Sequence, residues 1–130
     1  QRRILADRRE HHLFVNEQGR YELVEIDEVS EVAQGAVKAF LFRRAAKPED
    51  TYVITWAVEG QLRLRLPGDQ VAAMRPFGTP LTCVHADGST EVPVGPRTYL
   101  VFRDAERDSV RQRLRQAQGV SQDGPQTRSE

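Results

Sequence analysis

One short segment, residues 61–66 (QLRLRL), alternates polar residues and leucines without interruption. Successive side chains of a β-strand point to opposite faces, so the three leucines share one face and Gln61, Arg63 and Arg65 share the other. A helix cannot separate the two residue types in this way, because its side chains repeat every 3.6 residues. The segment therefore predicts a strand with one buried face and one face in water.

Further segments rich in β-branched, aromatic and other apolar residues lie on both sides of this strand, at residues 13–15, 21–26, 37–42, 51–58, 71–77, 81–85, 90–94 and 98–102. Turn signals separate them: residues 16–19 (NEQG), Pro67-Gly68 and Asp87-Gly88. Residues 27–31, which are mostly acidic, and residues 47–50 are expected to connect strands. Short strands without interleaved helices predict an all-β fold, an antiparallel β-sandwich of about 7–9 strands.

The spacing of the apolar residues changes after Asp104 from that of a strand to that of a helix. Val110, Leu114 and Ala117 form a narrow apolar stripe at this helical spacing. Asp104 is expected to cap this short C-terminal α-helix and Gly119 to end it. The predicted organisation is a linker or short helix over residues 1–12, a β-sandwich domain over 13–103, the helix over 104–118 and a disordered tail over 119–130.

Charge and cysteine content exclude several classes of function. Lys plus Arg and Asp plus Glu both number 19, so no net field favours nucleic acid. Cys83 is the only cysteine, which excludes an intrachain disulfide and a multi-cysteine zinc site. No apolar run approaches the length of about 20 residues that spans a bilayer. Neither a nucleic acid nor a membrane is therefore an expected partner.

Several local patterns occur over roughly residues 20–103: Trp56 in a strand, residues 60–67 (GQLRLRLP), Val71, Phe77-Gly78, Asp87-Gly88, residues 92–94 (VPV) and residues 96–100 (PRTYL). In this order they resemble the β-sandwich domain that follows the catalytic barrel in many glycoside hydrolases. The chain departs from the pattern where Arg97 and Thr98 lengthen the step to Tyr99, and in the charged helix after Phe102.

The resemblance implies a non-catalytic accessory domain that packs on, or supports, the catalytic barrel of the same carbohydrate-active parent protein. The catalytic carboxylates would then lie in that barrel and not in this chain. The alternative is a carbohydrate-binding module that acts alone. A small enzyme is a third class, but no residue set supports it.

The residues that could carry chemistry do not form a recognisable set. Acids are plentiful, but Glu22 and Glu25 have opposite parity and point to opposite faces of one strand. Cys83 and His85 share a face, yet two ligands do not make a metal site. We therefore expect no catalytic residue, no metal and no cofactor.

Carbohydrate binding has more candidates, because sugar rings stack on aromatic faces held by a rigid sheet. Trp56 is the only tryptophan, and it shares its parity with Tyr52 and Ile54, which favours packing among apolar neighbours. Arg63 and Arg65 on the polar face of their strand could bind an anionic group. Trp56, Tyr52, Arg63 and Arg65 are the candidate sugar-binding residues.

Overall fold

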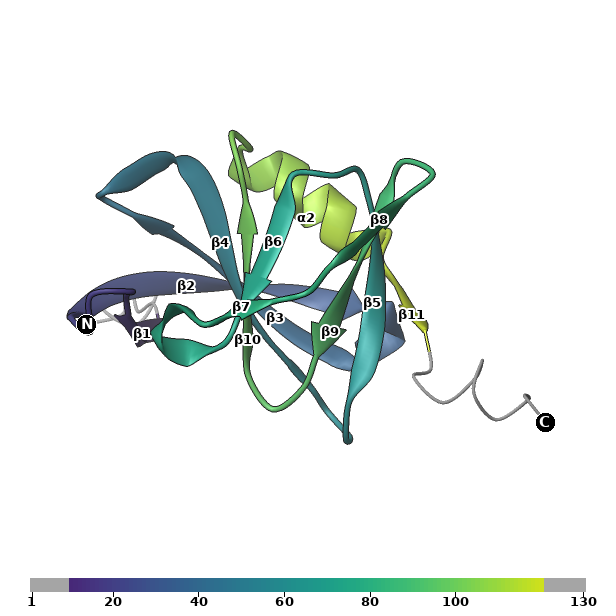
Figure 1. The fold of residues 1–130 in the computed structure, drawn as a ribbon. Helices are drawn as coiled ribbons and strands as arrows, with labels where there is room; N and C mark the ends of the chain where they lie inside the picture. The colour runs from purple at the N-terminus through teal and green to yellow at the C-terminus, as the bar shows by residue number, and fades with distance from the viewer. Residues whose placement is uncertain (1–9, 121–130) are drawn as a thin grey trace, which may run out of the picture.

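The computed structural model describes residues 10–120. Within them the chain forms eleven strands, one α-helix and two 3-10 turns (Figure 1). The strands are β1 (Glu10–Val15), β2 (Tyr21–Val32), β3 (Val37–Arg44), β4 (Lys47–Ala57), β5 (Leu62–Pro67), β6 (Val71–Met74), β7 (Pro80–Leu81), β8 (Val84–Ala86), β9 (Ser89–Val94), β10 (Thr98–Phe102) and β11 (Gln118–Val120). The helix is α2 (Arg107–Arg115), and the 3-10 turns are η1 (Ala33–Gly35) and η2 (Pro76–Gly78).

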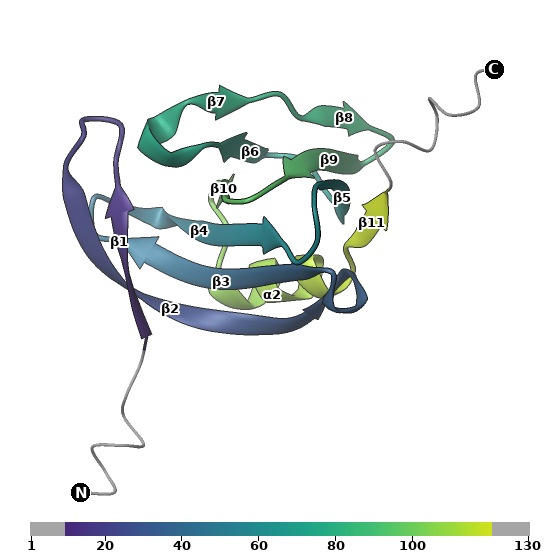
Figure 2. The same ribbon diagram turned by 90° about the horizontal axis from the view of Figure 1, so that it is seen from below.

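The strands form two antiparallel sheets. The large sheet has the order β1-β2-β3-β4-β10-β6-β7, and the small sheet has the order β11-β5-β9-β8 (Figure 2). Every strand pair is antiparallel, as in β5, where Leu64 lies opposite Val92 of β9. The predicted all-β, sandwich-like fold with a short C-terminal helix is confirmed.

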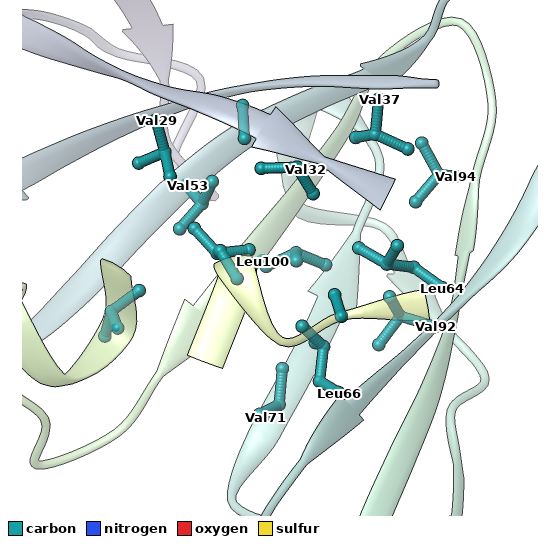
Figure 3. Close-up of a cluster of buried hydrophobic side chains, with 14 of the residues drawn as sticks. Val29, Val32, Val37, Val53, Leu64, Leu66, Val71, Val92, Val94 and Leu100 are labelled. Carbon is teal, nitrogen blue, oxygen red and sulfur yellow. The ribbon is translucent and has the colours of Figure 1, made fainter. Parts of the chain in front are cut away.

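The main core lies between the two sheets (Figure 3). Leu64 and Leu66 of β5 are fully buried there, and they contribute to one cluster with Val53 and Leu100 of the large sheet. Arg63 and Arg65 lie on the opposite face of β5, outside this core. The strict alternation of residues 61–66 therefore predicted the orientation of β5 correctly.

Helix α2 packs against β2 and β5 and thereby joins the two sheets at one side. Val110 and Leu114 are fully buried, and Ala117 just after the helix is nearly so, as their spacing predicted. The predicted bounds of 104–118 were wrong at both ends. The residue that caps the helix is Glu106 and not Asp104, and its side chain makes no capping hydrogen bond. The helix ends at Arg115, so Gly119 does not end it.

A second apolar cluster covers the outer face of the large sheet, the face turned away from the main core. The β1–β2 hairpin folds over that face, so that Phe14 of β1 packs against Phe42 of β3 and Tyr52 of β4. Figure 2 shows β1 crossing in front of the neighbouring strands. The large sheet is therefore covered on both faces along part of its length.

Several element boundaries differ from the sequence expectation. The acidic residues 27–31 belong to β2, because β2 continues through them to pair with β3. β4 begins at Lys47 and not at Thr51. Residues 10–12 belong to β1, and residues 118–120 belong to β11, which pairs with β5. The expectations for residues 1–9 and 121–130 lie outside the described residues.

Candidate functional site

The outer face of the large sheet holds a dense aromatic cluster. The ring of Phe14 lies 5.3 Å from that of Phe42, 5.8 Å from that of Tyr52 and 5.1 Å from that of Tyr99, measured between centroids. The tilted and edge-on geometries are those that aromatic pairs prefer. Because Phe14 is contributed by β1 and the other rings by β3, β4 and β10, this cluster holds the hairpin on the sheet.

A hydrogen bond between His12 and Tyr99 adds to this attachment. The Nε2 atom of His12 lies 2.6 Å from the Tyr99 hydroxyl oxygen. Burial, together with the positive charge of Arg97, lowers the pKa of His12, and burial raises the pKa of Tyr99. Both side chains are therefore held in their neutral forms near pH 7.

Arg44, the last residue of β3, forms a buried ion pair beside this cluster. Its side chain is only 5% exposed and donates two hydrogen bonds to the Glu22 carboxylate, at 3.0 and 2.7 Å. Its guanidinium also lies over the Phe14 and Tyr52 rings, at 5.0 and 5.2 Å from the centroids. The Arg44 hydrogen bonds lower the pKa of Glu22, and the pair with Glu22 raises the pKa of Arg44.

Next to Arg44 lies a cavity of about 520 Å³, which we call the turn hollow. It is bordered by the β1–β2 turn at Glu17, the beginning of β4 and Gly78 of η2. Its lining includes Arg44 and Tyr52, and Ala72 and Val101 of the sheet face. The turn hollow combines charged rim residues with apolar sheet residues.

The four sugar-binding candidates from the sequence do not lie on one surface. Trp56 is half-buried on the outer face of the large sheet, where its ring stacks on that of Phe40 at 5.4 Å and an interplanar angle of 18°. Tyr52 belongs to the same face but is only 4% exposed. The packing of Trp56 among apolar neighbours agrees with the sequence analysis, although this cluster is separate from the main core.

Arg63 and Arg65 lie on the outer face of the small sheet, where both bind Glu91. Their Nε atoms are each 3.2 Å from a Glu91 carboxylate oxygen, and a second nitrogen of Arg65 lies at 2.8 Å. Hydrogen bonds from Arg65 and Arg63 lower the pKa of Glu91. The two arginines thus already share a carboxylate, which competes with any external anion for their N–H groups.

The other candidate side chains contact separate partners and do not lie together at one site. His85 contacts the Thr90 hydroxyl at 2.9 Å through Nδ1, and burial raises the pKa of the half-buried Cys83 thiol. Glu22 binds Arg44, whereas Glu25 points to the exposed side of the hairpin near His11, as their opposite parity predicted. Within residues 10–120, no group of three or more His, Cys, Asp or Glu side chains could hold a metal ion.

The outward face of the β1–β2 hairpin exposes large apolar side chains. Leu13 lies opposite Leu23, and Val15 lies opposite Tyr21. Leu13, Leu23 and Tyr21 are 55%, 67% and 70% exposed. We call these four residues the hairpin face.

Neither the hairpin face nor the Arg44 ion pair was predicted from the sequence. Residues 21–26 contained a signal for the hairpin face, because this strand has apolar residues on both faces. Tyr21 and Leu23 point to one face, and Val24 and Ile26 point to the other. The ion pair had no comparable signal, because Glu22 and Arg44 are separated by 22 residues in the chain.

The fold and these surfaces define a sandwich-like all-β domain whose β1–β2 hairpin exposes apolar side chains. Comparisons with family models, curated proteins and solved structures return no match. Among the described residues, no helix combines the length and the apolar character that crossing a membrane requires.

Proposed function

We propose that this chain is a non-catalytic accessory domain of a larger, glycoside hydrolase-like protein, and that it packs on the catalytic barrel of that protein through the hairpin face. The docking proposal rests on the exposure of Leu13, Tyr21 and Leu23 side by side on one face of the hairpin. Contiguous exposed apolar residues of this kind mark surfaces that contact another protein. The assignment to carbohydrate-active proteins rests on the sequence resemblance.

The size of the hairpin face favours a partner in the same polypeptide. The exposed parts of the Leu13, Tyr21 and Leu23 side chains together have a surface area on the order of 350 Å². A stable complex of separate proteins buries about 800 Å² on each partner. Burying 350 Å² contributes about 9 kcal/mol at about 25 cal/mol per Å², which the association cost of about 4–15 kcal/mol largely cancels. A covalent linker reduces that cost by raising the effective concentration.

Hydrogen exchange tests the docking proposal. The isolated chain is compared with the longest natural polypeptide that contains it, and the amide exchange rates of residues 11–15 and 21–25 are measured in both. We expect at least tenfold slower exchange in the longer polypeptide, because the partner excludes water from the hairpin face.

Two variants of the longer polypeptide make this comparison specific. Leu23→Asp places a charge in the contact and should restore fast exchange at the hairpin. Val84→Asp is the matched control, because Val84 is also an exposed apolar residue but lies on β8 of the small sheet. Equal exchange in the isolated chain and the longer polypeptide would refute the docking. So would a coding sequence that is no longer than these 130 residues.

A carbohydrate-binding module that acts alone is the second candidate. The observation that favours it is the position of Trp56, whose ring is half-buried on an outer sheet face and stacked on Phe40. Lys38 lies opposite Trp56 in the register and contacts Glu28 at 3.8 Å, so polar groups flank the aromatic pair. Aromatic rings with polar neighbours can bind a sugar by stacking and hydrogen bonding.

Fluorescence of the single tryptophan tests this candidate directly. Titration with oligosaccharides should change the Trp56 emission in a saturable way, and acrylamide quenching should fall when the sugar is bound. Lys38→Ala should weaken the response, whereas Arg65→Ala on the small sheet should not. An unchanged emission across the oligosaccharides would count against a platform at Trp56.

A further inference from the structure

Two buried polar side chains line the turn hollow. Arg44 and Tyr52 are 5% and 4% exposed, and the Tyr52 hydroxyl accepts a hydrogen bond of 2.9 Å from Nη1 of Arg44. A tyrosine hydroxyl can also donate one hydrogen bond. The Tyr52 oxygen is therefore partnered by Arg44, and no buried side-chain nitrogen or oxygen among residues 10–120 is without a hydrogen-bond partner. The Tyr52 hydroxyl hydrogen can still donate to an oxygen of a ligand or of water in the hollow.

The charges around the hollow are of both signs. Glu22 neutralises Arg44, which leaves Lys47 and Arg103 as the cations of the lining. The lining carboxylates are Glu17, which lies 3.9 Å from Arg44, and Glu49, Asp50 and Asp104. These carboxylates outnumber the cations, so an anion would meet an excess of like charge. A neutral ligand avoids this repulsion and can use the carboxylates as strong acceptors for its hydroxyl groups.

The sheet side of the hollow is apolar. Ala72 and Met74 of β6 and Val101 of β10 belong to its lining. These residues can pack against C–H groups, whereas the rim can bind hydroxyl groups as donors and as acceptors. The volume of about 520 Å³ also lies in the range of small-molecule sites, about 300–1,000 Å³.

We propose that the turn hollow binds a neutral polyhydroxyl molecule the size of one or two sugar rings. A ligand oxygen accepts the Tyr52 hydrogen, ligand hydroxyls donate to rim carboxylates such as Glu49, and the carbon skeleton lies against Val101. This site is separate from the hairpin face and from Trp56, and it does not depend on docking to another domain.

Amide chemical shifts of the isolated chain provide the test. Glucose, maltose and cellobiose are titrated separately against the isotope-labelled chain, with glutamate and lysine as charged probes. We expect at least one sugar to cause saturable shifts at millimolar concentration, centred on residues 47–52 and 101–104. The charged probes should cause weaker shifts at these residues.

Two substitutions and one control locate the site. Tyr52→Phe removes the donor but keeps the ring, and it should weaken the binding about tenfold, as expected for the loss of one hydrogen bond. Glu49→Gln, at an exposed rim residue, should weaken binding without changing stability. Tyr99→Phe is the matched control, because Tyr99 is another buried tyrosine whose hydroxyl binds His12 outside the hollow.

Three outcomes would overturn the proposal. The first is the absence of saturable shifts with all three sugars. The second is a set of shifts centred on Trp56, which would support the second candidate function. The third is tighter binding of glutamate or lysine than of any sugar, which would indicate a charged ligand.

Discussion

Substitution of Glu22 by Gln tests the structural role of the buried ion pair. The change keeps the shape of the side chain but removes the charge that faces Arg44. Glu25→Gln is the matched control, because Glu25 lies on the same strand but is 61% exposed on the other side of the hairpin. Comparing the two variants separates the ion pair from any general effect of charge or strand propensity.

The expected cost follows from the burial of the two partners. Breaking a fully buried pair costs about 3–5 kcal/mol, whereas an exposed pair contributes about 0–1 kcal/mol. Arg44 is 5% exposed and Glu22 is 24% exposed, so the pair lies between these limits but nearer the buried one. We expect Glu22→Gln to lower the free energy of unfolding by about 2–3 kcal/mol, and Glu25→Gln to lower it by less than about 0.5 kcal/mol.

Urea denaturation at several pH values provides the measurement. The folded state lowers the pKa of Glu22, so this group stabilises the fold above the unfolded pKa, and the contribution is lost as the pH falls through the folded pKa. The difference between the original chain and Glu22→Gln should therefore be largest near pH 7 and should narrow in acid, below about pH 4. Equal stabilities at pH 7, or a difference that grows in acid, would refute this reasoning.

Three further predictions concern single residues. Because burial lowers the pKa of His12, its protonation favours unfolding, and stability should decrease as the pH falls below about 6.5; a His12→Gln variant should show a flatter pH profile in thermal unfolding. Leu66→Ala should cost about 2–5 kcal/mol in urea denaturation, and Leu62→Ala, at a half-buried position of the same strand, should cost clearly less; similar costs would contradict the burial of β5. Phe40→Ala should shift the Trp56 emission to longer wavelength, because the stacked ring that shields the indole is removed, and an unchanged spectrum would argue against that stack.

The strands were predictable where their pattern was local. The alternation of Leu62, Leu64 and Leu66 correctly indicated which face of β5 is buried. Asp87-Gly88 correctly marked a tight turn, since both residues adopt positive φ between β8 and β9. These local patterns predicted the structure correctly because they depend on neighbouring residues only. This holds both for the alternation of side chains along a strand and for the geometry of a tight turn.

Boundaries were wrong where long-range pairing outweighed local preference. The mostly acidic residues 27–31 have low β-propensity, yet they belong to β2 because β3 and α2 provide partners for them. In the same way, Gln118–Val120 forms a strand because β5 offers a free edge, which no pattern near Gly119 indicates. These choices depend on what lies beside the segment in space.

The candidate sites depended almost entirely on such spatial relations. The parity of Tyr52 and Trp56 correctly placed both side chains on one face of β4. It could not show that the β1–β2 hairpin folds over that face, buries Tyr52 and leaves Trp56 half-buried. Arg63 and Arg65 were assigned correctly to a polar face, but their shared partner Glu91 lies on another strand.

The sequence by itself determined the β architecture, the buried face of β5 and the apolar stripe of α2, because these follow from side-chain periods of 2 and 3.6 residues. Only the tertiary structure decided where the hairpin packs. That packing brings Glu22 to Arg44, creates the turn hollow and leaves Leu13, Tyr21 and Leu23 exposed together. The physical reason is that each of these features joins residues from separate strands, and their free energy depends on burial that no single segment can define.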